Sequence, residues 1–181
     1  MVKMEIEVKL KVERFNWIRK IMREIGAERK GEVEHEDIYY QHPCRDFKKT
    51  GEALRMRKTK DGKFIFTYKE AVKKPKLKVR REVEVKVEDP FKMEKIIERL
   101  GFKRITTIVK RREKWRYREA TICLDEVKGL GKYVEIELMV EDLEAAEKKM
   151  RRILEKLKLD REEAITKSYL EIFLEKNQRK S

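Results

Sequence analysis

The chain has 181 residues, of which 46% are charged and 40% hydrophobic, and its formal net charge is +14. This hydrophobic content excludes an intrinsically disordered protein, and the length is sufficient to bury the core of one domain. No apolar run approaches the ~20 residues that span a bilayer, and the N-terminus shows no signal-peptide pattern, so we expect a cytoplasmic protein without a membrane partner. The positive charge favours a polyanionic partner.

The two cysteines, Cys44 and Cys123, are too few for a disulfide framework. Cys44 is close in sequence to the two histidines, His35 and His42, but their spacing matches no zinc motif. Asn and Gln are scarce while Lys and Glu are abundant, a bias typical of hyperthermophile proteins. We therefore expect part of the charge to serve thermal stability in a thermophile.

Residues 4–12 are the first predicted strand, with charged residues at odd positions and apolar residues at even ones. Alternate side chains of a strand face opposite sides, so one face is ionic and the other hydrophobic. For a single strand this pattern indicates a sheet with one hydrated face. Here the charged motif occurs twice, as Glu5-x-Glu7-x-Lys9 and Glu82-x-Glu84-x-Lys86.

The repeated motif belongs to a longer internal similarity. Residues 4–30 and residues 81–104 each run in the order strand, helix, glycine and strand. In the second copy Asp89 is suited to cap the helix, Pro90 to occupy its first turn and Gly101 to end it. This similarity indicates a diverged duplication, whose two halves would enclose one cavity.

Further elements complete a predicted single domain over 1–181, with residues 177–181 as a disordered tail. Asp61-Gly62 predicts a hairpin turn, and Asp142 predicts the start of a helix over 142–158, with a last helix over 167–176. Eight strands are expected at 4–12, 32–40, 53–58, 63–71, 77–88, 105–118, 121–127 and 132–140. Eight strands suffice for a small closed barrel. The predicted fold is therefore α+β, an eight-stranded antiparallel β-barrel with helices packed outside.

If the apolar strand faces pack on helices, the charged faces point into the barrel. The expected inward acids are Glu5, Glu7, Glu82, Glu84, Asp125, Glu135 and Glu137. The expected inward bases are Lys9, Arg55, Arg57, Lys69, Lys78, Arg80, Lys110 and Arg112. Burying unpaired ions is costly, so such an interior must hold water or a ligand. Carboxylates favour Mg²⁺ or Mn²⁺, and arginine and lysine favour phosphate, so the set predicts a site for metal and polyphosphate.

Other chemistries have weaker support. Each charged residue taken alone is as well explained by a hydrated salt bridge on a thermophile surface. Gly129-x-Gly131 lacks the lysine and hydroxyl of a P-loop, and neither histidine lies in a nucleophile motif. The alternating aromatic residues are expected to fill the core or its rim, and these are Tyr39, Tyr40, Phe64, Phe66 and Tyr68.

Over roughly residues 1–175 the chain resembles the CYTH superfamily, the triphosphate tunnel metalloenzymes. The stretch 42–47 and Lys167-Ser168-Tyr169-Leu170 are similar to its class IV adenylyl cyclase branch. The motifs that carry the wider resemblance are Glu5-x-Glu7-x-Lys9, Asp37-x-Tyr39-Tyr40, Ala53-Leu54-Arg55-Met56-Arg57, Thr67-Tyr68-Lys69, Arg80-x-Glu82-x-Glu84, Lys110-x-Arg112, Leu124-Asp125, Gly129-Leu130-Gly131 and Glu135-Ile136-Glu137.

The resemblance implies an antiparallel tunnel, often in homodimers, that binds a triphosphate with Mg²⁺ or Mn²⁺. The implied metal ligands are Glu5, Glu7, Asp125, Glu135 and Glu137. The expected phosphate ligands are Lys9, Arg55, Arg57, Lys69, Lys78, Arg80, Lys110 and Arg112, and among them Lys9, Arg57 and Lys110 are the expected catalytic residues. Glu82 and Glu84 are accessory candidates, which either orient bases or bind metal.

Three functions remain open from the sequence. An adenylyl cyclase would direct the ribose 3′-hydroxyl of ATP at the α-phosphorus, giving cyclic AMP and pyrophosphate. A triphosphatase on the same scaffold would direct water at the terminal phosphorus of tripolyphosphate, thiamine triphosphate or a nucleoside triphosphate. A non-catalytic binder of polyphosphate or nucleic acid is the third, although the inward carboxylates disfavour nucleic acid because they repel phosphate.

Overall fold

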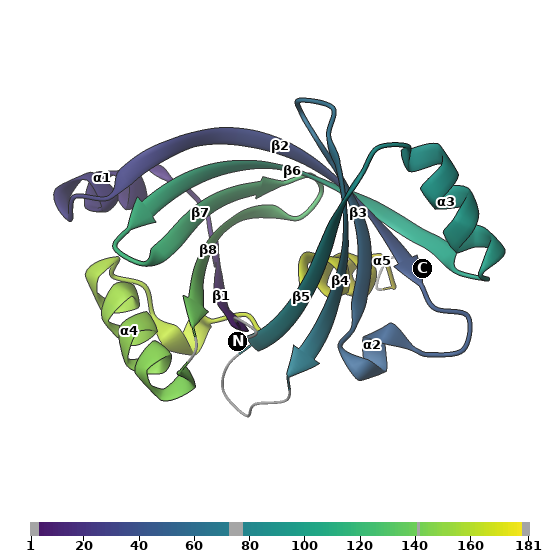
Figure 1. Ribbon diagram of the computed structural model, residues 1–181. Helices are drawn as coiled ribbons and strands as arrows, with labels where there is room; N and C mark the ends of the chain where they lie inside the picture. The colour runs from purple at the N-terminus through teal and green to yellow at the C-terminus, as the bar shows by residue number, and fades with distance from the viewer. Residues whose placement is uncertain (1–3, 73–77, 141, 179–181) are drawn as a thin grey trace.

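The computed structural model describes residues 4–72, 78–140 and 142–178, and they form a closed eight-stranded antiparallel barrel (Figure 1). The order around the barrel is β1-β5-β4-β3-β2-β6-β7-β8. The strands are β1 (Met4–Val12), β2 (Glu28–Gln41), β3 (Ala53–Thr59), β4 (Phe64–Val72), β5 (Lys78–Val87), β6 (Lys103–Tyr117), β7 (Ala120–Val127) and β8 (Gly131–Val140). The predicted fold class is confirmed, and the largest difference is that β2 begins at Glu28 rather than at residue 32.

Helices lie outside this barrel, as predicted (Figure 1). They are α1 (Asn16–Glu24), α2 (Phe47–Thr50), α3 (Pro90–Arg99), α4 (Leu143–Lys156), the 3₁₀ helix η1 (Arg161–Glu163) and α5 (Tyr169–Gln178). The sequence did not predict α2 and η1, because one turn is too short to show a helical period. Helix α5 continues to Gln178, past residue 177 where the tail was expected to begin, and residues 179–181 lie outside the described part. Within the described residues, no helix has the length and hydrophobicity to cross a membrane.

The strand order agrees with an internal duplication. Strands β1 to β4 correspond in order to strands β5 to β8. When each strand is exchanged for its counterpart, the order around the barrel is the same but is read in the opposite direction. Corresponding strands β1 and β5 are antiparallel neighbours, with Glu5 opposite Arg80, and β2 and β6 are antiparallel neighbours as well. A two-fold rotation between two copies of one unit produces this pairing. The repeated motif in the sequence therefore corresponds to a repeat in space.

The main hydrophobic core lies between the outer surface of the barrel and two helices, α1 and α4. In β1 the even residues Ile6, Val8 and Leu10 are all buried there. They pack with Met22 of α1 and Leu154 of α4, among other apolar side chains of the same cluster. Because the apolar residues of β1 face the helices, the charged residues between them must face the barrel interior.

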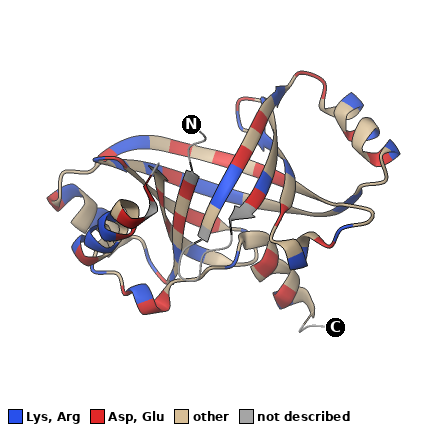
Figure 2. Ribbon diagram, turned by 60° about the horizontal axis from the view of Figure 1, so that its bottom comes forward, with Lys and Arg blue, Asp and Glu red and all other residues tan. Residues whose placement is uncertain are grey.

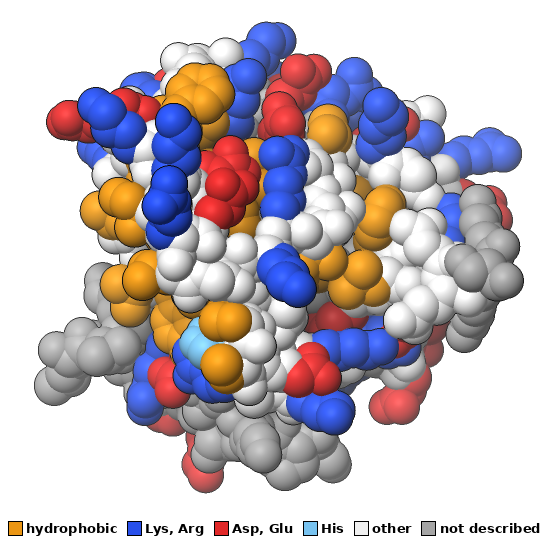
Figure 3. Space-filling view, turned by 90° about the vertical axis from the view of Figure 1, so that its right-hand side faces the viewer, with side chains coloured by type: hydrophobic (Ala, Val, Ile, Leu, Met, Phe, Trp, Pro, Cys, Tyr) orange, Lys and Arg blue, Asp and Glu red, His pale blue; other side chains and the backbone are white. Residues whose placement is uncertain are grey.

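The half of the barrel formed by β2, β3, β4 and β5 has a smaller cover. Ile97 of α3 packs with Leu54 and other outward residues of these strands in a separate cluster. Val83 and Val85 of β5 stay 68% and 53% exposed. On the face shown in Figure 3, hydrophobic side chains are scattered among charged ones rather than gathered in one patch. This half of the barrel therefore has a smaller hydrophobic core than the other half, and its main contribution to the site is its charged inner face.

The predicted helix caps and hairpin turn are confirmed. The Asp89 carboxylate accepts a hydrogen bond from the Lys92 backbone N–H at 3.0 Å, and Pro90 follows in the first turn of α3. The Asp142 carboxylate likewise accepts from the Glu144 N–H at 2.9 Å at the start of α4. Gly62 has a φ of +80° between β3 and β4, a conformation that glycine adopts without strain. Local side-chain chemistry therefore sets these boundaries.

Candidate active site

Charged side chains gather inside the barrel. Figure 2 shows Lys, Arg, Asp and Glu alternating with other residues along its strands. Several predicted inward residues are almost inaccessible to solvent, namely Lys9, Arg55, Lys110, Arg112, Asp125 and Glu135. Charges buried to this degree are tolerated when they are paired with opposite charges. Their partners therefore determine the arrangement of the site.

Arg112 of β6 is the centre of the largest charged group. Its Nε and Nη2 donate to the two carboxylate oxygens of Asp125, at 2.7 and 2.6 Å. Nη2 also donates to Glu135 and Nη1 to Glu137, each at 2.8 Å. Although burial raises the pKa of Asp125, Arg112 and Lys110 hold it below its usual value. Three predicted metal ligands thus meet on one guanidinium group.

Lys9 and Lys110 lie beside this group and contact its carboxylates. The Nζ of Lys9 pairs with Glu7 and lies 3.1 Å from Glu135. Burial lowers the pKa of Lys9, but Glu135 and Glu7 raise it by more, so Lys9 stays protonated. Lys110 Nζ is 3.5 Å from Asp125, and burial together with Arg112 lowers its pKa. The two ammonium groups therefore differ in how firmly they hold their protons.

A second group pairs Arg57 with Asp37, a residue that the sequence analysis did not assign to the site. Arg57 Nε and Nη2 donate to the two oxygens of Asp37 at 2.6 and 2.8 Å, and Arg55 lies 3.9 Å away. Burial raises the pKa of Asp37, but the hydrogen bonds from Arg57 and the charge of Arg55 lower it further. His35, Asp37 and Tyr39 are two residues apart along β2, so their side chains share one face of the strand. This alternation was the signal in the sequence that could have assigned Asp37 to the barrel interior.

The third group lies on β3, β4 and β5. Arg55 Nη2 donates to the Thr67 hydroxyl at 3.1 Å, and this hydroxyl donates to Glu84 at 2.9 Å. Lys69 pairs with Glu82. These contacts place both accessory glutamates next to bases. The predicted ligand Lys78 begins β5, but its side chain lies outside the described residues.

Two of the arginines show unsatisfied donors that fit an anionic ligand. The Nε–H groups of Arg55 and Arg80 are buried without a hydrogen-bond acceptor, and both side chains line the cavity inside the barrel. Within the described part of the chain, Arg80 also forms no ion pair. A buried N–H without an acceptor costs free energy that a phosphate oxygen at this position would recover.

The carboxylates around Glu5 fit a divalent cation by their chemistry. Burial and the nearby Glu137 raise the pKa of Glu5 to about 8, and Glu82 and Glu7 add to the effect. Burial raises the pKa of Glu137 as well. Crowded oxygen donors of this kind are the ligands of Mg²⁺ and Mn²⁺, which would stabilise their ionised forms.

The carboxylates are nevertheless not arranged in the geometry that coordinates a metal ion. Among the residues described, no three acidic, histidine or cysteine side chains are arranged to hold a metal ion. The reason is that Asp125, Glu135 and Glu137 are directed at Arg112. A metal ion here would be held by Glu5, Glu7 and Glu137, and by Asp125 and Glu135 once they turn from Arg112. It would polarise a phosphate oxygen and neutralise its charge.

The C-terminal segment contributes a residue that sequence patterns did not assign. Tyr169, the first residue of α5, lines the barrel cavity together with Ser168 and Lys9. Helix α5 lies behind β3, β4 and β5 in the view of Figure 1. Only the resemblance of residues 167–170 to a family motif drew attention to this position. Periodicity could not, because Tyr169 is part of a helix far from the strands in sequence.

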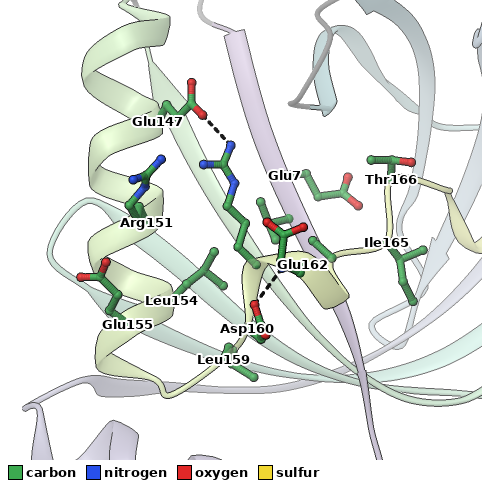
Figure 4. Close-up of a pocket in the computed structure, with 13 residues that line it drawn as sticks. Glu7, Glu147, Arg151, Leu154, Glu155, Leu159, Asp160, Glu162, Ile165 and Thr166 are labelled. Carbon is green, nitrogen blue, oxygen red and sulfur yellow. Dashed lines mark hydrogen bonds and ion pairs between the residues drawn. The ribbon is translucent and has the colours of Figure 1, made fainter.

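A larger cavity of about 720 Å³ lies between α4, η1 and β1 (Figure 4). Leu154 and Leu159 supply apolar lining, and the charged side chains include Glu155 and Glu162. Arg161 pairs with Glu147 across it. Carboxylates outnumber bases here, so this cavity does not suit a triphosphate in spite of its size.

The histidines and cysteines have separate environments. His35 is buried on the inner side of β2, and burial together with Arg57 lowers its pKa to about 3, so it is neutral at pH 7. His42 lies in the loop after β2, where its Nδ1 accepts hydrogen bonds from the backbone N–H groups of Cys44 and Arg45 at 3.0 Å each. Cys123 is buried in β7 and Cys44 is exposed.

Comparison with known proteins identifies the family. A sequence model described as the CYTH domain matches residues 3–169. The chain belongs to the CYTH family. The match extends from β1 to the first residue of α5, so it includes every charged group described above as well as Tyr169.

Individual relatives agree with this membership. A Methanocaldococcus jannaschii protein named "putative adenylate cyclase" is 37% identical over 171 residues, which are 93% of this chain and 97% of that protein. The PH1819 protein of Pyrococcus horikoshii OT3 has a TM-score of 0.85 at 41% identity, covering 95% of this chain and 99% of that one. A Hippeastrum protein described as a "putative adenylyl cyclase" that reveals a dominant triphosphatase activity has a TM-score of 0.68 at 16% identity, covering 96% of this chain and 95% of its own. At that identity it shows the CYTH fold alone.

We predict that Asp37→Asn lowers the free energy of unfolding at pH 7 by ~2–3 kcal/mol, because it leaves the Arg57 guanidinium without its charged partner. The pKa of Asp37 is lower in the folded than in the unfolded chain. Its contribution is therefore complete above the unfolded value of ~3.9 and is lost as the pH falls toward the folded one. Denaturant unfolding from pH 7 to pH 2 should show the two proteins converging in acid.

Asp61→Asn is the matched control, since Asp61 is an exposed carboxylate that also pairs with a base, Lys63. Its unfolding curves should stay close to those of the wild type throughout. A wild-type stability for Asp37→Asn at pH 7 would contradict the importance of the Arg57 pair.

Proposed function

We propose that this CYTH protein is a divalent-metal-dependent enzyme that binds a triphosphate inside its barrel, and that it is an adenylyl cyclase. The observation that carries the proposal is the pair of unsatisfied guanidinium donors on Arg55 and Arg80, in the same barrel interior as a group of crowded carboxylates. Phosphate oxygens satisfy the first and a metal ion the second. Few ligands other than a metal-bound polyphosphate present both.

The cyclase assignment is supported by similarity over nearly the full length to the archaeal protein named as an adenylate cyclase. In this reaction the ribose 3′-hydroxyl attacks the α-phosphorus of ATP and pyrophosphate leaves. Lys9, Arg57 and Lys110 are the proposed catalytic residues, since their charges would stabilise the anionic transition state. Lys110 has the lowered pKa of the two lysines, so it is the one better suited to exchange a proton.

A triphosphatase is the second candidate function, and the side chains that line the cavity inside the barrel favour it. The side chains around this cavity are mainly charged, with Tyr39 and Tyr169 as the aromatic ones. Such a lining accommodates a phosphate chain more readily than a nucleoside. The triphosphatase activity described for the Hippeastrum protein shows that one protein of this fold performs hydrolysis.

A product assay decides between the two reactions. Purified protein is incubated with ATP or with tripolyphosphate, with Mg²⁺ or Mn²⁺ at elevated temperature, and the products are separated by chromatography. We expect cyclic AMP and equimolar pyrophosphate from ATP. Orthophosphate, mainly from tripolyphosphate, would instead establish the triphosphatase, and binding without turnover of either would establish a non-catalytic binder.

Arg80 offers a clean test of the phosphate site, because truncating it breaks no ion pair among the described residues. We expect Arg80→Ala to raise the dissociation constant of tripolyphosphate ~10-fold or more, measured by calorimetry, with little change in thermal stability. Arg57→Ala should weaken binding similarly but also destabilise the fold, since it strands Asp37.

The neighbouring residue provides the control for Arg80. Arg81 lies on the outer side of β5 and is exposed, 3.9 Å from Glu70. Arg81→Ala removes the same charge and should bind tripolyphosphate as the wild type does. Equal losses in the two variants would mean that net charge, and not the barrel site, controls binding.

Glu137 tests the metal assignment. We expect Glu137→Gln to weaken Mn²⁺ binding ~10-fold or more and to abolish metal-dependent turnover, while the fold survives because the amide oxygen still accepts from Arg112. Electron paramagnetic resonance titration measures free Mn²⁺ directly. Glu126→Gln, at a partly exposed carboxylate on β7 that pairs with Arg111, is the control. Normal Mn²⁺ affinity in Glu137→Gln would remove Glu137 from the metal site.

A further inference from the structure

Tyr169 makes an unusual set of contacts for a residue at the start of a surface helix. Only 6% of it is exposed, and it lies against the charged interior rather than the outer core between the barrel and α1 and α4. Its hydroxyl donates to Asp125 Oδ2 at 2.8 Å. The oxygen that it contacts also accepts from Arg112, so the tyrosine is bonded directly to the central charged group.

The ring of Tyr169 contacts both buried lysines. Lys9 Nζ lies 4.4 Å from the ring centroid, and Lys110 Nζ lies 5.0 Å from it. An ammonium group over an aromatic ring is attracted by the negative face of the ring, and more strongly when both are desolvated. A third contact, with Tyr133 of β8 at 5.2 Å in an edge-on arrangement, supports the ring from the side. One side chain therefore contacts two predicted phosphate ligands and one predicted metal ligand.

Packing alone does not account for this arrangement. Helix α5 already attaches to its cluster through the partly buried Leu170, Ile172 and Phe173. A phenylalanine at 169 would fill the same volume without a hydroxyl group. The contacts of the hydroxyl with Asp125, and of the ring with Lys9 and Lys110, involve the charged site itself.

We propose that Tyr169 is a positioning residue of the triphosphate site. Its hydroxyl holds the Asp125 carboxylate while that carboxylate exchanges Arg112 for a metal ion, as an outer partner orients a metal ligand. Its ring holds the ammonium groups of Lys9 and Lys110 at a set separation for phosphate. The C-terminal helix thereby completes a site that is otherwise built from strands. This inference rests on the proposed binding of metal and triphosphate in the barrel.

Two substitutions separate the two contacts. Tyr169→Phe keeps the ring and loses the hydroxyl, so Mn²⁺ affinity should fall ~10-fold while tripolyphosphate binding without metal changes little. Tyr169→Leu loses the ring as well, so tripolyphosphate affinity without metal should also fall ~10-fold. Both affinities are measured on the full chain, Mn²⁺ by electron paramagnetic resonance and tripolyphosphate by calorimetry, at a temperature where all variants are folded.

Phe173→Leu controls for the attachment of α5, since Phe173 packs in the same cluster and has no charged partner among the described contacts. It should bind both ligands as the wild type does. Losses equal to those of Tyr169→Leu would overturn the proposal, because the helix would then matter only as packing. Tighter tripolyphosphate binding by Tyr169→Leu would overturn it too, because the ring would then be an obstacle.

The wild type distinguishes this inference from the proposed function. If the wild type binds neither Mn²⁺ nor tripolyphosphate, the function proposed for the barrel fails. If the wild type binds both and the two Tyr169 variants match it, the barrel site stands and the role of Tyr169 is wrong.

Discussion

The structure depends on mutual neutralisation of opposite charges inside a closed barrel. Water cannot hydrate these groups fully, so each buried base needs a carboxylate and each buried carboxylate a base. Arg112 with Asp125, and Arg57 with Asp37, meet this requirement, whereas the buried Nε–H groups of Arg55 and Arg80 lack an acceptor. Removing one partner is therefore costly, because the remaining charge has no replacement.

The same requirement explains why the hydrophobic core lies outside the barrel. A strand whose alternate residues are charged can place only its other face in a hydrophobic core, and the helices α1 and α4 cover that face on one half of the molecule. The two-fold arrangement of the strands then places the charged faces of both copies around one interior. The barrel is stabilised from outside, which leaves the inside available for chemistry.

The ion pairs inside the barrel also explain why a metal ion and a triphosphate would bind together. A triphosphate that takes the bases away from their carboxylates leaves those carboxylates uncompensated. A divalent cation takes up the released carboxylates, so the joint exchange keeps the interior near neutrality. The metal ion meets least competition from bases at Glu5, whose pKa is raised. The triphosphate meets least competition from carboxylates at Arg80, whose Nε–H has no acceptor. The metal requirement of such a site is thus electrostatic as well as chemical.

The sequence by itself determined the barrel and most of its inner surface. Alternation in each strand is a local property, and it assigns Glu5, Lys9 or Arg112 to one face without knowledge of the neighbouring strands. The repeated motif and the turn residues then limit how the strands connect. The helix caps at Asp89 and Asp142 were equally local, which is why they were predicted correctly.

Only the tertiary structure decided which charges meet. The importance of Asp37 comes from Arg57 on the adjacent strand, 20 residues away, and that of Tyr169 from Asp125, 44 residues away. A pattern along the chain gives the direction of a side chain but not its partner across the barrel. Barrel closure and the position of α5 supply the partners, since electrostatic interactions depend on distance in space rather than separation in sequence.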